Sequence, residues 1–381
     1  MVRIGAFRSG HDLRTREAGV DVLIVLPHLT VGGAERVTIL LAGELIDRGF
    51  RVHVAVFRCI GGFRDSIDPR IPVHQVGGAG SVKAVLPLAR LIRRLRPKAL
   101  MGVMVTPNLA ICLARRLSCR RPRIVLTEHN QVDRNAAYFA SGAYGLIRWV
   151  YPLADCIVCV SEGVRQSLIA FSGVDIRRTT VIHNPIISPE ILEKAAARCD
   201  HPWLEEPSVP VVLAVGRLTA AKDYPMLLRA FAVLHRRRPA RMIVLGDGPE
   251  REWLAATASE LGIADDVDLR GFEPNPYSYM ARASVFALSS AWEGFPTVLV
   301  EALACGAPVV ATDCRSGPRE ILCDGVLGPL VPVGDHEAFA DALVQVLDHP
   351  SERESRMARG AHFSVSRATD AYQRVLFGDE R

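Results

Sequence analysis

The stretch that decides the fold is Ser289-Ser-Ala-Trp-Glu-Gly-Phe-Pro-Thr-Val-Leu-Val-Glu-Ala302. It follows the apolar run Val285–Leu288, which has the length and composition of a buried strand. Pro296 suits the first turn of a helix, where a backbone N–H is not required. Glu293 would then lie in the loop between strand and helix, and Glu301 about one turn inside the helix. The stretch therefore predicts a strand–loop–helix unit of an α/β protein.

The same alternation of short apolar runs and amphipathic stretches occupies most of the 381-residue chain. Further strands are expected at Val22–Pro27, Arg51–Phe57, Ala99–Val105, Arg123–Glu128, Asp155–Ser161, Val211–Val215, Arg241–Leu245, Val267–Arg270 and Pro308–Ala311. Helices are expected at Ala34–Arg48, Leu86–Leu95, Glu162–Ala170, Met226–His235 and Glu250–Leu261. Strands separated by helices form parallel sheets, so the pattern predicts doubly wound, Rossmann-like units.

The alternation is interrupted between Ile186 and Pro210, where four prolines occur. We therefore expect an N-terminal domain of residues 1–186, a linker of residues 187–209 and a C-terminal domain of residues 210–361. A last helix at about 362–381 is expected to pack back on the N-terminal domain. In such sheets ligands bind beyond the carboxyl ends of the strands, so the residues that follow each strand are the candidate site.

The charge is divided unevenly. The chain is 49% hydrophobic and 23% charged, as in a globular protein, with a net charge of +5. Residues 1–185 carry 26 Lys/Arg against 13 Asp/Glu, and the remainder carries 20 against 28. Between Asp68 and Glu128 there are 12 Lys/Arg and no acidic residue. The two halves are thus expected to have different partners.

The basic half admits two interpretations. Its apolar stripe predicts a packed crossover helix with a solvated basic side, and the long acid-free span favours docking on an anionic membrane. The stripe is Leu88, Leu91, Ile92 and Leu95, with Arg90, Arg93, Arg94, Arg96, Arg115, Arg116, Arg120, Arg121 and Arg123 around it. No stacking aromatics interleave these arginines, so we expect no nucleic-acid partner. Since no apolar run is long enough for a membrane span or a signal peptide, we expect a cytoplasmic protein, peripheral on the cytoplasmic face of the membrane.

Two motifs could suggest a metal and are interpreted otherwise. Cys156 and Cys159 form a C-x-x-C inside an apolar run, which favours small residues in a buried strand. Asp266 and Asp268 form a D-x-D that leads into a strand, as in a helix–strand connector. No metal site and no cofactor are therefore expected.

Two loops carry anion-binding features. Gly32 and Gly33 lie between a strand and a helix N-terminus, where backbone N–H groups can approach a phosphate, although a plain tight turn fits as well. Arg217 and Lys222 share the loop after a later strand, and two cations there suit a diphosphate, or else are solvated surface charges. Glu293 and Glu301 could each accept hydrogen bonds from a pair of sugar hydroxyls. The combination predicts a nucleotide-sugar site.

At this point the chain resembles a known family. The stretch from Val211 to Leu322 is similar to the donor domain of family-4 retaining glycosyltransferases with the GT-B fold, in which two Rossmann-like domains face each other across a cleft. The matching segments are GRLTAAKDYPMLLRAF, LGDGPERE, LRGFEPNPYSYMARASVFALSSAWEGFPTVLVEALACGAPVVATD and SGPREIL, with PHLTVGGAERV, TEHN, VSEGV and VIHNPI in the N-terminal half. They most resemble the branch that builds bacterial polysaccharides or lipid-linked oligosaccharides.

The resemblance implies a role for each candidate residue. Arg217 and Lys222 would bind the donor diphosphate, Glu293 the transferred sugar and Glu301 the ribose. The other implied site residues are Gly294, Phe295, Pro296 and Thr297 around sugar and phosphate, Gly32 and Gly33 closing over the diphosphate, His129 near the anomeric carbon, and Phe272 near the base.

The implied activity is transfer of a hexose or N-acetylhexosamine from a nucleotide-diphosphate sugar, UDP being favoured, with retention. The acceptor would be a membrane-associated, polyprenyl-diphosphate-linked glycan. A GT-B epimerase and a non-catalytic nucleotide-sugar-binding subunit remain as alternatives.

Overall fold

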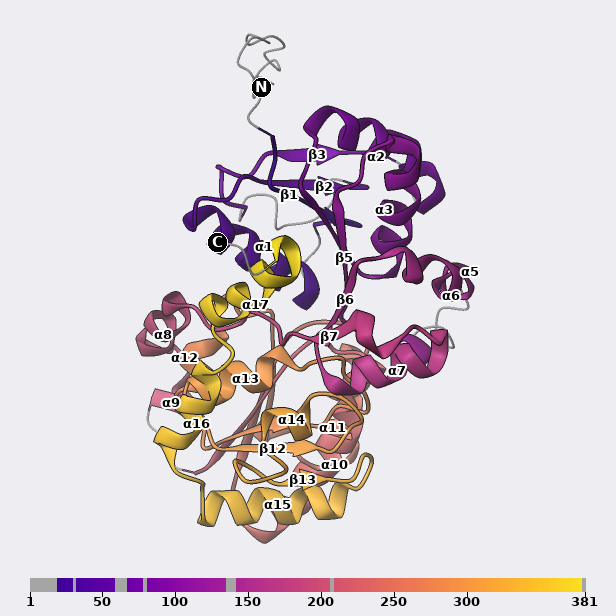
Figure 1. Ribbon diagram of the computed structural model, residues 1–381. Helices are drawn as coiled ribbons and strands as arrows, with labels where there is room; N and C mark the ends of the chain where they lie inside the picture. Colours follow the sequence, from indigo (N-terminus) through magenta and orange to yellow (C-terminus); the bar gives the residue numbers. More distant parts are fainter. Residues whose placement is uncertain are drawn as a thin grey trace, which may run out of the picture.

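Two parallel sheets, each covered by helices on both faces, make up the protein (Figure 1). The structure is a computed structural model that describes residues 19–29, 32–58, 67–77, 81–134, 142–205 and 209–378. The N-terminal sheet lies above the C-terminal one in Figure 1, with the helices of each around it. The predicted α/β class with two Rossmann-like domains is confirmed.

The N-terminal sheet has seven strands in the order β3-β2-β1-β4-β5-β6-β7. They are β1 Val22–Leu26, β2 Val52–Val56, β3 Val73–Gln75, β4 Ala99–Val103, β5 Arg123–Glu128, β6 Cys156–Cys159 and β7 Thr179–Val181. Its helices are α1 Gly33–Asp47, α2 Ser81–Leu95, α3 Val105–Ser118, α5 Gly142–Gly145, α6 Ile147–Val150 and α7 Glu162–Ser172. Strands β1 and β4 are buried along their whole length because helices cover both faces of the sheet.

The C-terminal sheet has six strands in the order β10-β9-β8-β11-β12-β13. They are β8 Val211–Val215, β9 Arg241–Leu245, β10 Val267–Gly271, β11 Val285–Leu288, β12 Val309–Thr312 and β13 Leu330–Val331. Its helices are α10 Tyr224–Arg237, α11 Arg251–Glu260, α12 Pro276–Met280, α13 Thr297–Ala304, α14 Pro318–Ile321 and α15 His336–Asp348. The strand order reverses between β8 and β11, as it does between β1 and β4, and such switch points are where open α/β sheets bind ligands.

The chain crosses between the two sheets twice. The first crossing contains α8 Pro189–Ala196 and α9 Pro202–Glu205, and the return follows α16 Arg353–Ala361. The two crossing segments touch at an isolated parallel bridge between Ile187 and Ser364. The last helix, α17 Val365–Phe377, then lies against α1 and β5, where Phe377 stacks on Phe50 with ring centroids 4.7 Å apart (Figure 1).

Several elements were not anticipated from the sequence. Helix α3 is buried on most sides, so its sequence lacks the one-sided apolar stripe that identifies a surface helix. Strands β3 and β13 have only three and two residues, too few for an alternating pattern. The expected strand with Cys156 and Cys159 is confirmed as β6, in which Cys159 is buried and Cys156 is half-buried. The buried leucine stripe of α2 is confirmed as well.

Candidate active site

The loops after β5, β6 and β11 meet between the two sheets. From the N-terminal side, the Gln131 side chain donates to the carbonyl of Glu293 at 3.0 Å, and the Ser161 hydroxyl donates to the carbonyl of Gly294 at 2.8 Å. Parallel strands gather their carboxyl ends at one edge, and here the two edges face each other. The fold thereby brings the loop that contains His129 against the loop that contains Glu293.

Glu293 is held by a cation and a hydroxyl of its own domain. Lys222, which follows β8, lies 2.5 Å from Oε1 of Glu293, and the Ser290 hydroxyl donates to the same oxygen at 2.7 Å. The loop that contains Lys222 is itself held in place, because the backbone carbonyl of Lys222 accepts a hydrogen bond from the Ser289 hydroxyl at 2.7 Å. The two predicted residues Lys222 and Glu293 are therefore brought together at the β8–β11 switch point, in fixed positions.

Glu301 has partners that sequence reasoning missed. It is 2% exposed on α13, and Arg36 of α1 reaches it from the opposite domain, with Nη1 2.5 Å from Oε1. Arg36 also donates to the hydroxyl of Tyr277, which lies 3.4 Å from the same carboxylate oxygen. Arg36 ends the Gly-Gly-Ala-Glu-Arg segment that begins at Gly32. Its position one helical turn after the two glycines is the feature of the sequence that could have indicated a site residue.

Gly294 marks a close approach of the two domains. A Cβ added there would lie 1.9 Å from the carbonyl oxygen of His129 and 3.2 Å from Cα of Asn130. Any side chain would thus collide with backbone, which cannot rotate away. The glycine of this loop lets the domains close on each other.

His129 is buried beside a second titratable group. Burial lowers the pKa of His129 to about 4, so its imidazole is neutral at physiological pH. One ring nitrogen lies 3.2 Å from the Thr127 hydroxyl, and Nδ1 has no hydrogen-bond partner among the described residues. The neighbouring Glu128 is fully buried, which raises its pKa to about 7 although Tyr151 and Asn108 donate to its carboxyl group.

The other predicted residues near the diphosphate are less enclosed. Gly32 precedes the first residue of α1, Gly33, and no atom lies within 4 Å of a Cβ added at Gly33. Arg217 follows β8 and is exposed. Phe272, which follows β10, is 72% exposed. A Cβ added at Gly32 would instead meet the Glu35 carboxylate, with Oε2 at 2.3 Å, so the open position of the α1 N-terminus is Gly33.

The loop into α13 is packed rather than open. Phe295 is buried and stacks on His183 with centroids 5.1 Å apart. Pro296 caps α13, and Thr297 is its first residue. Since Phe295 packs toward the crossing segments, it shapes the site by fixing this loop.

Further contacts across the cleft, also missed from the sequence, join the two domains. Glu320 of α14 caps the N-terminus of α7 from the other domain, because its carboxylate accepts from the backbone N–H of Glu162 at 3.0 Å and from that of Gly163. Arg315 forms an ion pair with Asp133 at 2.5 Å. No local pattern indicates these pairs, because each joins segments more than a hundred residues apart.

Asp266 and Asp268 face different partners. Asp266 lies 2.8 Å from His235, and Asp268 lies 3.1 Å from His201. Each carboxylate therefore belongs to a separate pair beside β10. Within the described ranges, no group of three or more His, Cys, Asp or Glu side chains is placed to hold a metal ion.

A strongly basic surface lies on the N-terminal domain away from the cleft. We define the basic face as the exposed residues Lys83, Arg90, Arg93, Arg116, Arg120 and Arg121 of α2, α3 and the following loop. Two exposed leucines, Leu86 at 59% and Leu117 at 47%, lie on the same two helices. Arg93 donates to the carbonyl of Leu117 at 3.0 Å, which joins α2 to the end of α3.

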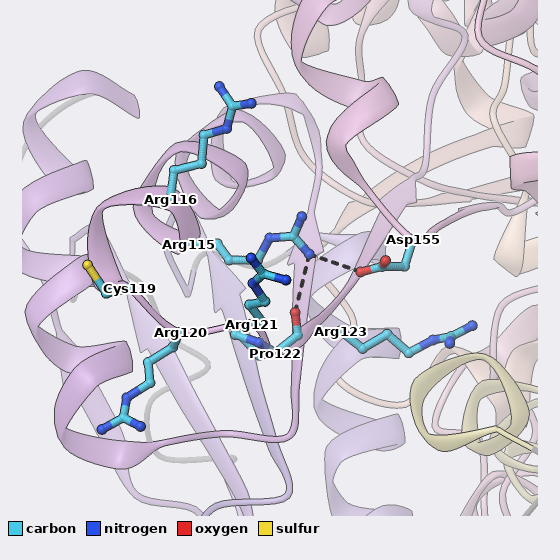
Figure 2. Close-up of a pocket in the computed structure, with 8 residues that line it drawn as sticks. All are labelled: Arg115, Arg116, Cys119, Arg120, Arg121, Pro122, Arg123 and Asp155. Atoms are coloured by element: carbon cyan, nitrogen blue, oxygen red, sulfur yellow. Dashed lines mark hydrogen bonds and ion pairs between the residues drawn. The ribbon is translucent and has the colours of Figure 1, made fainter.

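A hollow of ≈ 740 Å³ opens beside the end of α3 (Figure 2). Arg115 is engaged there by Asp155 at 3.1 Å and by the Pro122 carbonyl. Figure 2 shows that Arg116 and Arg120 instead point outward in different directions. In the part of the chain that the structure describes, no ion pair involves Arg116, Arg120 or Arg121. The guanidinium groups of Arg116 and Arg120 thus point away from each other, whereas in Figure 2 that of Arg121 lies beside Arg115.

The GT-B class of transferases is defined by two domains, each built on a sheet of parallel strands, whose switch points face each other across a cleft. One family model, Glycosyltransferase Family 4, matches residues 31–187, and another, Glycosyl transferases group 1, matches residues 200–362. The chain therefore belongs to the family-4 glycosyltransferases and is a glycosyltransferase of the GT-B fold.

Two similar proteins are bacterial glycosyltransferases. One is the N-acetylgalactosamine-N,N'-diacetylbacillosaminyl-diphospho-undecaprenol 4-alpha-N-acetylgalactosaminyltransferase of Campylobacter jejuni, 29% identical, with 87% of this chain and 91% of that protein covered. Another is the lipopolysaccharide core biosynthesis glycosyltransferase LpsE of Rhizobium meliloti, 29% identical over 91% and 96% of the two chains. These relatives support a glycosyltransferase of lipopolysaccharide or polysaccharide biosynthesis.

The fold is shared with solved structures. HepE of Anabaena, in complex with UDP-glucose, matches with a TM-score of 0.78 at 22% identity, covering 93% of this chain and 99% of that chain. The lipopolysaccharide outer core galactosyltransferase WaaB matches with a TM-score of 0.74 at 22% identity, covering 94% and 99%. Among the described residues, no helix has both the length and the apolar character that spanning a membrane requires.

Proposed function

We propose that this glycosyltransferase moves a hexose or N-acetylhexosamine from UDP to a polyprenyl-diphosphate-linked glycan, with retention and without a metal. The observation that carries the proposal is the pair of carboxylates, Glu293 and Glu301, each neutralised by a cation at the β8–β11 switch point. A site that keeps a buried carboxylate, Glu301, and a half-buried one, Glu293, paired with cations is prepared for a ligand that brings hydroxyl donors and negative phosphates together.

The donor would lie across that edge of the C-terminal sheet. Glu301 would accept from the ribose hydroxyls and Glu293 from hydroxyls of the transferred sugar. Arg217 and Lys222 would bind the diphosphate. Because negative charge grows on the diphosphate as the sugar departs, cations fixed beforehand stabilise the transition state more than the ground state.

The N-terminal domain would complete the site. Gly32 and Gly33 would offer backbone N–H groups to the diphosphate, and Phe272 would lie near the base. The neutral imidazole of His129, with Nδ1 without a partner among the described residues, suits a hydrogen bond to the sugar near its anomeric carbon. Closure of the domains would exclude water, and attack from the face that the leaving group vacates would retain the configuration.

The relatives support the substrates. The Campylobacter jejuni enzyme is named for a diphospho-undecaprenol acceptor, and the HepE crystal contains UDP-glucose. We assign acceptor binding to residues 1–186 with the helix of residues 362–381, donor binding to residues 210–361, and the linker to residues 187–209.

The test is transfer by purified protein, with lipid-linked acceptors analysed by mass spectrometry after a thermal-shift panel of nucleotide sugars. Glu293→Ala and Lys222→Ala should each abolish most turnover while the melting curve keeps a single cooperative transition. Lys194→Ala is the matched control, because it removes an exposed lysine that pairs with Glu190 of its own helix, α8. Near-normal transfer by both site variants would refute the assignment. Binding of UDP-sugar without nucleotide release for any acceptor would favour the binding-subunit alternative, and inversion of the sugar without transfer would favour the epimerase.

The basic face supports docking on an anionic bilayer. Arg116 and Arg120 point outward in different directions, and Leu86 and Leu117 are exposed on α2 and α3, as expected for contact with many headgroups at once. The acceptor of the proposed reaction is itself in the membrane, so docking on the cytoplasmic leaflet would bring the enzyme to its substrate.

Vesicle sedimentation tests this docking. Arg116→Ala combined with Arg120→Ala should weaken partition onto phosphatidylglycerol-containing vesicles by about thirtyfold, since each near-surface cation contributes about 1 kcal/mol. Arg229→Ala combined with Arg236→Ala removes the same charge from exposed positions on α10 and should change partition little. Equal losses for both pairs would mean that only net charge matters.

A further inference from the structure

The ion pair between Arg36 and Glu301 crosses the cleft at the place where the donor ribose is proposed to bind. We propose that Arg36 is a donor-responsive bridge: it neutralises Glu301 when the site is empty, and it transfers to the donor diphosphate when the ribose takes Glu301. The inference rests on the proposed function and adds a residue that was not among the predicted site.

The empty site needs a counter-ion at this position. Glu301 is 2% exposed on α13, and an unpaired carboxylate so deeply buried would be strongly destabilising. Arg36 supplies the charge with Nη1 at 2.5 Å, while its other terminal nitrogen bonds Tyr277. The guanidinium carbon also lies 5.8 Å from the centre of the Tyr277 ring. The fork of the guanidinium is thus fitted to two groups of the donor domain.

The same carboxylate cannot serve Arg36 and the ribose equally well. Its Oε1 already accepts from Arg36 and from the Tyr277 hydroxyl at 3.4 Å, which occupies both lone pairs of that oxygen, whereas a ribose diol that bridges the carboxylate needs a lone pair on each oxygen. A bound nucleoside would therefore compete with Arg36 for Glu301. Once displaced, the half-buried guanidinium of Arg36 is available to another anion, and the diphosphate of the donor would provide it.

The position of Arg36 in α1 suits this transfer. It lies three residues after Gly33, the first residue of the helix, and its backbone N–H donates to the carbonyl of Gly32 at 3.1 Å. The proposed diphosphate contacts and the guanidinium are therefore on one helical turn. Lys222 makes the equivalent pair with Glu293, but inside one domain. Because Arg36 belongs to the other domain, its exchange would couple donor occupancy to domain closure.

The affinities of uridine and of UDP, measured by calorimetry, distinguish the two proposed partners of Arg36, which are Glu301 and the donor diphosphate. In Arg36→Ala, the UDP dissociation constant should rise about ten- to a hundredfold, the usual loss for a hydrogen bond to a charged group. Uridine, which has no phosphate, should bind as tightly as in the wild type or more tightly, because its competitor for Glu301 is gone. Arg36→Lys keeps the charge but not the fork, and should lose less UDP affinity than Arg36→Ala.

Arg315→Ala is the matched control. It breaks another cross-cleft ion pair, with Asp133 at 2.5 Å, outside the proposed donor contacts. Neither uridine nor UDP affinity should change in this variant if Arg36 acts through the ligand. A similar selective loss of UDP in Arg315→Ala would show that weakened closure alone explains the effect and would overturn the proposal.

The remaining outcomes are also decisive. Equal weakening of uridine and UDP by Arg36→Ala would assign Arg36 a structural role only, and unchanged binding of both would exclude it from the donor site; either result overturns the bridge. If the wild-type protein prefers guanine nucleotide sugars in the thermal-shift panel, the same binding test uses guanosine and GDP in place of uridine and UDP. If the wild type binds no nucleoside diphosphate, the proposed function fails first, and this outcome is distinct from the failure of Arg36 alone.

Discussion

Replacing Gly294 by alanine should open the cleft without disturbing either domain. The added Cβ would lie 1.9 Å from the carbonyl oxygen of His129, and Cβ contacts under 3.0 Å are essentially never found, so the loops must separate by about 1 Å. Both colliding atoms are fixed, one being the new Cβ and the other backbone, so no rotamer change relieves the contact. Gly294 has no positive φ, and alanine therefore adds no backbone strain.

The expected consequence is a loss of rate larger than the loss of stability. Separation would stretch the hydrogen bonds from Ser161 to the Gly294 carbonyl and from Gln131 to the Glu293 carbonyl, which are 2.8 and 3.0 Å long. A misplacement of about 1 Å between reacting groups can cost about a hundredfold in rate. Overpacking costs about 1–3 kcal/mol, here at a domain interface and not in a core.

The assay is kcat/KM for sugar transfer, with urea unfolding and the radius of gyration in solution measured alongside. Gly43→Ala is the control, because no atom lies within 4 Å of a Cβ at this position inside α1. It should keep full activity and gain up to about 1 kcal/mol of stability. If Gly294→Ala transferred sugar at the wild-type rate, the close contact with His129 would be irrelevant to turnover and the reasoning would be wrong.

Three further predictions concern stability and donor binding. Glu128 has a folded pKa of about 7 against an ordinary 4.5, so its contribution to stability is complete below pH 4.5 and is lost as pH rises through 7. Relative to wild type, Glu128→Gln should therefore gain about 3 kcal/mol in unfolding free energy between pH 4.5 and 7; urea melts showing a constant difference would contradict this. Glu320→Ala removes an acceptor from the N-terminus of α7 and should lower the free energy of unfolding by about 1 kcal/mol. The urea midpoint at pH 7 measures this loss, and an unchanged midpoint would show that Glu320 does not cap the helix. Phe272→Ala, at a side chain 72% exposed, should leave stability within about 0.5 kcal/mol but weaken uridine about tenfold, as loss of stacking on a base would; unchanged uridine affinity would remove Phe272 from the base site.

The local elements were largely available from the sequence. Strands such as Val211–Val215 and Val285–Leu288 are short apolar runs that any buried parallel strand requires, and the structure has them with the predicted bounds. The positions of Glu293 and Lys222 after neighbouring strands also followed, because the carboxyl ends of parallel strands share one edge. Helix α3 was missed since it is buried on most sides and carries no periodic signal.

By itself, the sequence determined the α/β class, the two-domain division of charge, and which loops carry glycines, cations and carboxylates. All of these are properties of neighbouring residues, where periodicity and turn chemistry act. Only the tertiary structure decided that Arg36 meets Glu301 across 265 residues of chain, and that Gly294 lies against the backbone of His129. Such pairs depend on how two separately folded sheets are oriented, and that orientation comes from packing between domains, which leaves no local pattern in the chain.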